Sequence, residues 1–297
     1  MGVELVINEK LIYENSKGQS IQLGNEKPFI LVNVAGTGNT DVDVQTQKAP
    51  RQDGSTYIDS LMEPRDISIT ALILAENQKV LFQKRAELQS VFNPKLPPGK
   101  LIYDYGDNRK EIEATVSSTP AFLPGEERTS ISQLVQIELT CPLPFWLSEL
   151  TQEEPMAAFV GMFMFPLEIP EEEGVEIGAQ GEQRIIENKG DVSAPVKIEF
   201  RGPALNPRIQ NNTTGEFIQV NQELQSGESL HINTAFGKKR VEIEDEEGDR
   251  TNAFNWIDLD SAFWQLEPGE NELEYSADTG QDDATVTIRW RERFVGV

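Results

Sequence analysis

The sequence predicts a mostly β protein of two sandwich-like domains, with one amphipathic helix in the first domain. At 297 residues, the chain exceeds the roughly 100–200 residues of a usual single domain. Hydrophobic residues make up 38% of it and charged residues 26%, with 22 Gly and 17 Pro, a composition typical of a globular protein with many turns. Short segments of alternating polarity recur between turn residues, as the strands of a sandwich do.

The first domain is predicted over residues 1–147. In the run 67–73, Ile67, Ile69, Ala71 and Ile73 share one face, as a half-buried strand requires. A hairpin is expected around Gly106-Asp107-Asn108, and the last alternating strand ends at Pro142. The expected strands are 21–23, 29–34, 67–73, 100–105, 110–116 and 135–141.

One segment of the first domain has helical spacing instead. Between Asn77 and Phe92, the apolar residues Leu81, Leu88 and Val91 recur among Gln, Lys, Arg and Glu, and Asn93-Pro94 ends the run. An amphipathic helix packed on a sheet is therefore predicted.

Residues 148–180 are predicted to be a linker that partly packs, because acidic, apolar and Pro-containing stretches follow one another there without a period. The second domain, 181–297, is predicted to be a β-sandwich with strands at 196–200 and 286–290. In the closing strand Val286, Ile288 and Trp290 share a face, which Phe294 is expected to join.

Charge and cysteine content exclude several classes of protein. With 26 Lys+Arg against 50 Asp+Glu, the net charge of -24 repels phosphate backbones and anionic membranes, so neither a nucleic-acid nor a membrane partner is expected. Cys141 is the sole cysteine, which rules out an intrachain disulfide and a cysteine metal cluster within one subunit. The N-terminus lacks the pattern of a secretory signal, and no stretch approaches the roughly 20 apolar residues of a membrane span. We therefore expect a soluble protein made in a cytoplasm.

Catalytic and metal-binding signatures are sparse. His231 is the only histidine and is expected to be a solvent-facing or hydrogen-bonded strand residue. Gly36-Thr37-Gly38 is interpreted as a turn, because it lacks the third glycine and the helix of a phosphate loop. The acidic run 242–249 is predicted to be a solvated hairpin tip, with calcium binding as the alternative. We expect no enzymatic activity, no catalytic, cofactor-binding or metal-binding residues, and no cofactor.

The tryptophans leave one binding function open. Trp256 and Trp264 could stack on sugar rings, although core packing is the preferred interpretation for both. Trp146, inside a Pro-flanked apolar segment, is predicted to be a buried anchor at the domain junction.

Several short segments, taken in order, resemble the distal tail protein family of long-tailed bacteriophages. Each is a turn or packing signal, and their order along nearly the whole chain makes the likeness specific. They are Asn93-Pro94-Lys95, Pro98-Gly99-Lys100-Leu101, Cys141-Pro142-Leu143-Pro144-Phe145-Trp146, Glu187-Asn188-Lys189-Gly190-Asp191-Val192-Ser193-Ala194-Pro195, Asn206-Pro207-Arg208-Ile209, Asn212-Thr213-Thr214-Gly215-Glu216, Leu266-Glu267-Pro268-Gly269-Glu270-Asn271 and Gly296-Val297.

The resemblance implies a structural subunit at the tip of a virion tail, made in the bacterial host cytoplasm. Family members form a ring, usually a homohexamer, through the first domain, and join the tail tube protein to the tail-tip protein. The second domain then resembles a galectin-like sandwich that faces baseplate or receptor-binding proteins and takes part in host attachment. Two alternatives stay open: a carbohydrate-binding β-sandwich that contacts host cell-surface glycans, and a glycosidase that uses two of the many carboxylates.

Overall fold

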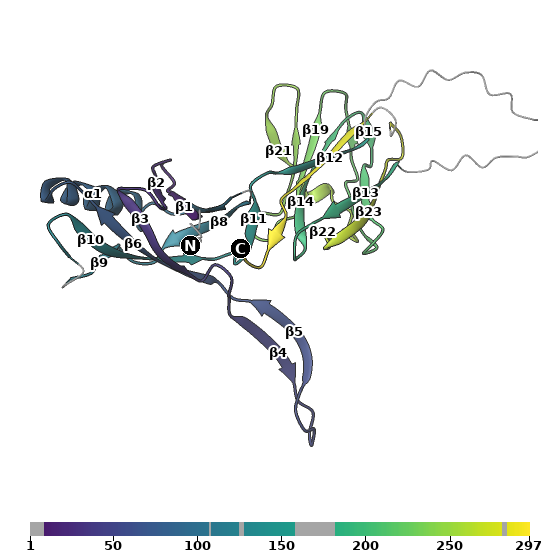
Figure 1. Cartoon of the computed structure of the whole chain (residues 1–297). Helices are drawn as coiled ribbons and strands as arrows, with labels where there is room; N and C mark the ends of the chain where they lie inside the picture. Colours follow the sequence, from purple (N-terminus) through teal and green to yellow (C-terminus); the bar gives the residue numbers. More distant parts are fainter. Residues whose placement is uncertain (1–8, 107, 125–127, 158–181, 281–283) are drawn as a thin grey trace, which may run out of the picture. The chain divides into compact units, whose positions relative to one another are not determined.

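The computed structural model describes residues 9–106, 108–124, 128–157, 182–280 and 284–297. The chain divides into two compact units. Unit 1 comprises Met1–Glu149 and Phe294–Val297, and unit 2 comprises Leu150–Arg293 (Figure 1). The predicted mostly β fold is confirmed, with one α-helix in the described part of the chain.

Unit 1 is built on antiparallel strands in the order β2-β1-β7-β8-β10-β6-β3. Its elements are β1 (Glu9–Glu14), β2 (Ser20–Leu23), β3 (Phe29–Ala35), β4 (Val42–Gln47), β5 (Thr56–Met62), β6 (Arg65–Leu74), α1 (Gln78–Val91), β7 (Gly99–Tyr105), β8 (Arg109–Val116), β9 (Ala121–Phe122), β10 (Ser132–Cys141) and β11 (Trp146–Ser148). β11 pairs with β8 and with β25 (Arg293–Phe294).

The core of unit 1 follows the predicted alternation. Ile67, Ile69, Ala71 and Ile73 of β6 are all buried, and Ile69 lies opposite Ile137 of β10. Since successive strand side chains point to opposite faces, the intervening residues of β6 face away from this core. The hairpin of β7 and β8 is also confirmed.

Helix α1 begins and ends where the sequence predicts. The side chain of Asn77 caps it by accepting a hydrogen bond from the Val80 backbone N–H at 3.0 Å. Leu81 and Leu88 are buried against the sheet, and just past the helix end the ring of Phe92 stacks on Tyr13 with centroids 4.5 Å apart.

Unit 2 consists of two main antiparallel sheets in the orders β12-β24-β14-β19-β20-β21 and β13-β23-β16-β17. Its elements are β12 (Gln152–Ala157), β13 (Glu182–Asn188), β14 (Ala194–Arg201), β15 (Ala204–Leu205), β16 (Arg208–Asn211), β17 (Glu216–Gln219), β18 (Glu223–Leu224), β19 (Ser229–Asn233), β20 (Arg240–Glu244), β21 (Arg250–Asn252), the 3-10 helix η1 (Phe254–Trp256), β22 (Gln265–Leu266), β23 (Gly269–Ser276) and β24 (Thr285–Trp290). In the core between the sheets, the ring of Phe200 in β14 packs against the ring of Tyr275 in β23, with ring centroids 5.8 Å apart. This is the packing of a β-sandwich.

Two details of the chain path differ from the sequence predictions. β12 falls inside the predicted linker 148–180, yet it pairs with β24 as an ordinary strand of unit 2. Residues 158–181, the rest of that segment, lie outside the described residues. Phe294 does not join the face of Val286, because the chain turns back after β24 and Phe294 packs against the core of unit 1.

Candidate assembly surfaces

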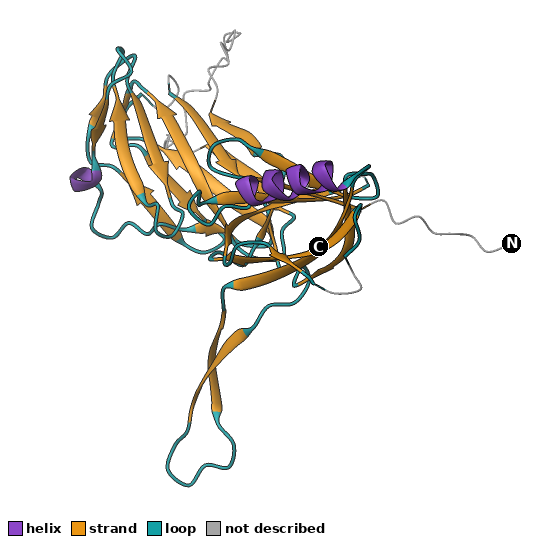
Figure 2. Ribbon diagram, turned by 90° about the vertical axis from the view of Figure 1, so that its left-hand side faces the viewer, coloured by secondary structure: helices purple, strands orange, loops and turns teal. Residues whose placement is uncertain are grey.

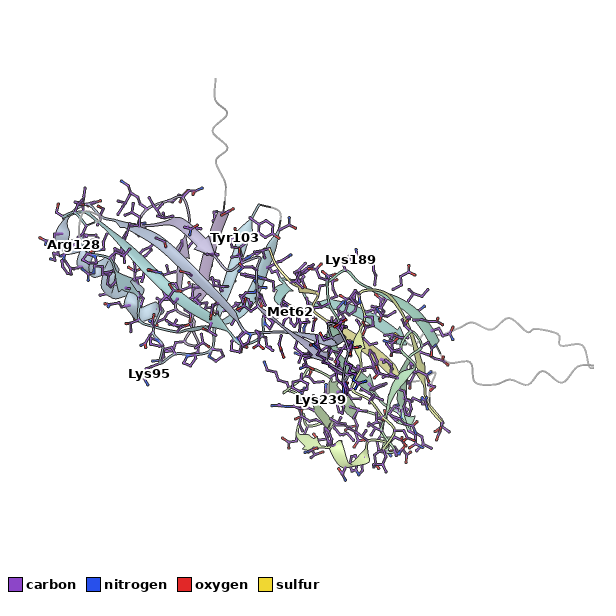
Figure 3. The ribbon with its side chains drawn as sticks, turned by 90° about the horizontal axis from the view of Figure 1, so that it is seen from below. Met62, Lys95, Tyr103, Arg128, Lys189 and Lys239 are labelled. Atoms are coloured by element: carbon purple, nitrogen blue, oxygen red, sulfur yellow. The ribbon has the colours of Figure 1, made fainter. Side chains whose placement is uncertain are left out.

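The most exposed element of unit 1 is a hairpin formed by β4 and β5, here called the arm. It is inserted between β3 and β6, which pair with each other, and it extends away from the sheet of unit 1 (Figures 1 and 2). Every residue of its two strands is exposed except Met62, which is half-buried at the end of β5 (Figure 3). The arm therefore lacks a core of its own.

Apolar side chains are nevertheless frequent on the arm. Those classed as exposed are Val42, Val44, Tyr57, Ile58 and Leu61, with exposed fractions from 46% to 60%. An isolated two-stranded hairpin is at best marginally stable in water, and both of its edges offer unpaired backbone groups. Exposed apolar side chains on a hairpin without a core are typical of an interaction site.

The base of the arm is fixed by a buried arginine. The guanidinium of Arg65 donates to the backbone carbonyls of Gly36 at 2.7 Å, Asn39 at 3.0 Å, Pro144 at 2.9 Å and Val295 at 2.5 Å. Its fork of donors suits several acceptors at once. Burial lowers the pKa of Arg65 from its ordinary value, and the guanidinium stays charged at neutral pH. Arg65, at the start of the strand that follows the arm, thus joins the segment that precedes the arm to the C-terminal residues.

The C-terminal segment packs into unit 1 through further contacts. The Lys110 ammonium lies 3.8 Å from the centre of the Phe294 ring and donates to the Gly296 carbonyl at 3.0 Å. Phe294 and Val297 both pack against the core. These residues therefore complete unit 1 although they follow unit 2 in the chain.

Two tryptophans predicted to be buried are core residues, and the sole cysteine is a core residue as well. Trp146 is fully buried in unit 1, and its indole N–H donates to the Thr37 carbonyl at 3.0 Å. Trp264 is buried and Trp256 partly buried in unit 2, as the core-packing interpretation requires. Burial raises the pKa of Cys141 to about 12, so this thiol is held protonated.

His231 occupies the outward-facing side of β19, in agreement with its predicted strand position. Its Nε2 lies 3.1 Å from Oε2 of Glu244, which also pairs with Arg250 at 2.6 Å. The acidic run 242–249 forms the hairpin of β20 and β21, as predicted. Gly36-Thr37-Gly38 is a turn, with Gly36 at φ +88° beside β6.

The carboxylates beside His231 are held by cations. Arg289 contacts both Glu153 and Glu199 at 2.7 Å, and Arg201 contacts Glu199 at 2.9 Å. Although burial pushes the pKa of Glu199 upward, hydrogen bonds from Arg289 and Arg201 hold it below its ordinary value. A glycosidase needs one carboxyl group that stays protonated as the acid, and this network favours the ionised form.

The described residues offer neither a metal cluster nor a membrane-spanning helix. Within them, no group of three or more His, Cys, Asp or Glu side chains could hold a metal ion. No helix in the same residues has both the length and the apolar character to cross a membrane.

Sequence reasoning missed two features of unit 1, the arm and Arg65. The arm does carry a signal, because the run Val42-Asp43-Val44-Gln45 alternates between the predicted strands 29–34 and 67–73. Arg65 carries no sequence signal for its burial, since a lone charged residue before a strand is ordinarily exposed.

Two protein-family models match the chain, one in each unit. The phage tail protein RIFT-related domain matches residues 16–141, and the siphovirus-type tail component, C-terminal domain, matches residues 189–294. No curated protein gives a significant match.

Solved structures share the fold across almost the whole chain. The SPP1 Dit protein (gp 19.1), described as a paradigm of the hub adsorption apparatus in phages that infect Gram-positive bacteria, aligns with a TM-score of 0.67 at 12% identity, over 96% of this chain and 99% of that one. A chain of the phage P2 baseplate in its activated conformation with Ca aligns with a TM-score of 0.54 at 10% identity, over 98% and 100% of the two chains. At sequence identities of 10–12%, the similarity to these structures shows a shared fold and nothing further.

Proposed function

The chain belongs to the siphovirus-type phage tail components, and we propose that it is the ring-forming hub subunit at the tip of the virion tail. In this role it joins the tail tube protein to the tail-tip protein and to the baseplate or receptor-binding proteins. It acts as a structural protein without enzymatic activity, cofactor, nucleic-acid partner or membrane partner, and it is made in the bacterial host cytoplasm.

The observation that carries the proposal is the arm. Its strands expose apolar side chains without a core beneath them, and its base is clamped by the four carbonyl contacts of Arg65. A rigid base combined with an uncovered hairpin fits an element that is buried only on assembly. Strand edges pair readily with a neighbouring chain, and repeated head-to-tail contacts between identical subunits close a ring.

The proposal divides the work between the domains. Residues 1–147, completed by Phe294–Val297, form the ring. The remainder of 181–297, joined by β12 from the segment 148–180, faces the other baseplate components. Limited proteolysis tests this division, because acidic, Pro- and Gly-containing stretches such as residues 170–174 are preferred cleavage sites when exposed. Two resistant fragments support the division, and one resistant core that spans residues 148–180 refutes it.

Light scattering after size exclusion tests ring formation on the full chain. Six subunits of 33.3 kDa give a particle of about 200 kDa (6 × 33.3 kDa), which negative-stain images should show as a ring. Tyr57→Ser combined with Leu61→Ser should shift the protein toward the monomer, because both side chains belong to the exposed arm. Ile185→Ser, which removes an apolar side chain that is 70% exposed in unit 2, is the matched control and should leave the ring intact. A monomer at every concentration would refute the proposal.

A second candidate function, glycan binding by unit 2, is favoured by one polar cavity of about 320 Å³ on the face of β14, β19 and β20. His231, Asn233, Arg240 and Glu242 line it and could bind hydroxyl groups. No Phe, Tyr or Trp side chain lines it, so this cavity lacks the stacking platform common in sugar sites. Glycan-array binding by the wild-type protein that is lost in Asn233→Ala would establish this function. Binding to no glycan on the array would exclude it.

A further inference from the structure

The six-stranded path of unit 2 carries loops of opposite charge at the two ends of one strand. β20 is preceded by the loop 234–239, which contains Lys238 and Lys239 and no acidic residue. It is followed by the loop 245–249, in which four of five residues are acidic. Since a strand rises about 3.3 Å per residue, the five residues of β20 hold these loops roughly 16 Å apart.

The first loop, here called the basic knob, exposes an aromatic ring beside its lysines. Phe236 is 85% exposed. The Lys239 ammonium lies 6.0 Å from the Phe236 ring and 5.1 Å from the ring of Phe263, which stacks on the exposed Phe254 at 5.6 Å. Within the described part of the chain Lys239 contacts no carboxylate, so its charge is available to a partner (Figure 3).

At the opposite end of β20 the surface is hollowed into an acidic cleft of about 480 Å³. Arg201 is the one cation among the residues that line this cleft. Its carboxylates come from Glu199, Glu228, Glu244, Asp245, Glu246 and Glu247.

Four of these carboxylates lack a cation. Glu199 pairs with arginines, as does Glu244. The other four, in contrast, form no ion pair among the described residues; they are Glu228, Asp245, Glu246 and Glu247. Three glycines also line the cleft, and only Gly248 has open space beside its Cα, because Glu246 lies against Gly227 and Gln225 against Gly202.

We propose that the basic knob of one subunit docks into the acidic cleft of unit 2 of a second copy of this chain. The knob offers the Lys239 ammonium and one protruding ring, and the cleft offers uncompensated carboxylates. A knob cannot reach the cleft of its own subunit, because β20 separates the two, so the contact is between subunits. An anionic glycan or phosphate would suit the knob but would be repelled by the cleft, whereas a second copy occupies both.

This contact is heterologous, since two different surfaces meet, and it therefore repeats from subunit to subunit around a ring. The inference rests on the proposed self-assembly and adds a contact that unit 2 makes between neighbouring subunits. Opposite charges in contact also offset part of the repulsion between chains of net charge -24.

A charge swap in the full chain tests the docking, with the subunit dissociation constant measured by sedimentation at fixed salt. Lys238→Glu with Lys239→Glu should weaken association by about tenfold or more, because like charges then meet in the contact. Glu246→Lys with Glu247→Lys should weaken it similarly, although it makes the net charge less negative. All four substitutions together keep the net charge at -24 and should restore most of the affinity. Thermal unfolding curves check that each variant is folded.

The matched control is Lys17→Glu with Lys189→Glu, which changes the net charge as the knob variant does but at exposed lysines elsewhere. It should associate more tightly than the knob variant. If wild-type protein associates and both double variants match it, the docking is refuted while ring formation stands. If the variant with all four substitutions does not regain the association affinity of the wild-type protein, the knob and the cleft are not partners. If wild-type protein fails to associate at all, the proposed function fails first.

Discussion

Replacing Arg65 with Met is expected to destabilise unit 1 and to loosen the base of the arm. The guanidinium donates to four backbone carbonyls, those of Gly36, Asn39, Pro144 and Val295. A hydrogen bond to a charged group contributes about 1.5–3 kcal/mol, so four contribute roughly 6–12 kcal/mol before desolvation. Removing the buried charge returns several kcal/mol of desolvation energy.

The net loss is then about 3 kcal/mol or more, because methionine fills the space and leaves the carbonyls without donors. For a domain of this size, each kcal/mol shifts the melting temperature by about 2–4 °C, so the unfolding of unit 1 should move down by about 6–12 °C. Differential scanning calorimetry measures this shift, and Arg65→Lys should lose roughly half as much since an ammonium has only three donors.

Hydrogen exchange localises the effect. Amides in residues 36–41 and 294–297 should exchange faster in Arg65→Met, whereas amides in β14 and β19 of unit 2 should be unchanged. If the variant melts within about 2 °C of wild type and both segments keep their protection, water replaces the arginine at little cost and the clamp is not a stabilising feature.

Three further predictions concern unit 1. Trp146→Ala removes a fully buried indole and should cost about 3–5 kcal/mol of unfolding free energy in a denaturant titration; an unchanged midpoint would show that the site is not a core site. Gly36→Ala should cost about 1–3 kcal/mol, because Gly36 has φ +88° and an added Cβ would meet the Asp66 carbonyl oxygen, whereas Gly38→Ala, with open space around it, should be near neutral. Burial raises the pKa of Cys141 to about 12, which disfavours the reactive thiolate; native protein should therefore label slowly with a thiol reagent from pH 7 to 9 and rapidly once unfolded, and fast native labelling would contradict its burial.

The periodicity of apolar residues along the sequence predicted the strands and the helix that bury one face. The alternation of 135–141 lies within β10, and the segment 77–92 brackets α1 with its Asn77 cap. Both follow from the side-chain periods of strand and helix, which a single sequence displays directly. Trp146 was predictable as a core residue for a related reason, since a large aromatic in an apolar run is usually buried.

Features that depend on distant partners were not predictable. The arm buries neither face within the chain, so the alternation of Val42-Asp43-Val44-Gln45 does not by itself reveal that these strands stand apart from the core. Phe294 continues the period of β24 in the sequence, but tertiary packing sends it to the core of unit 1. Likewise, the basic knob and the acidic cleft are separate charge runs in the sequence, and only the pairing of β19, β20 and β21 puts them at opposite ends of one sheet.

The late position of Val295 has a consequence for biosynthesis. Ribosomes add about 5–20 residues per second, so the 144 residues of unit 2 (150 to 293) take roughly 7–30 s to emerge after the rest of unit 1. During that interval Arg65 lacks the last of its four carbonyl partners, and the base of the arm is incompletely clamped. A nascent chain therefore presents its arm in finished form only after unit 2 has been translated. A chain that stops before Val295 would lack the contact that completes the clamp at the base of its arm.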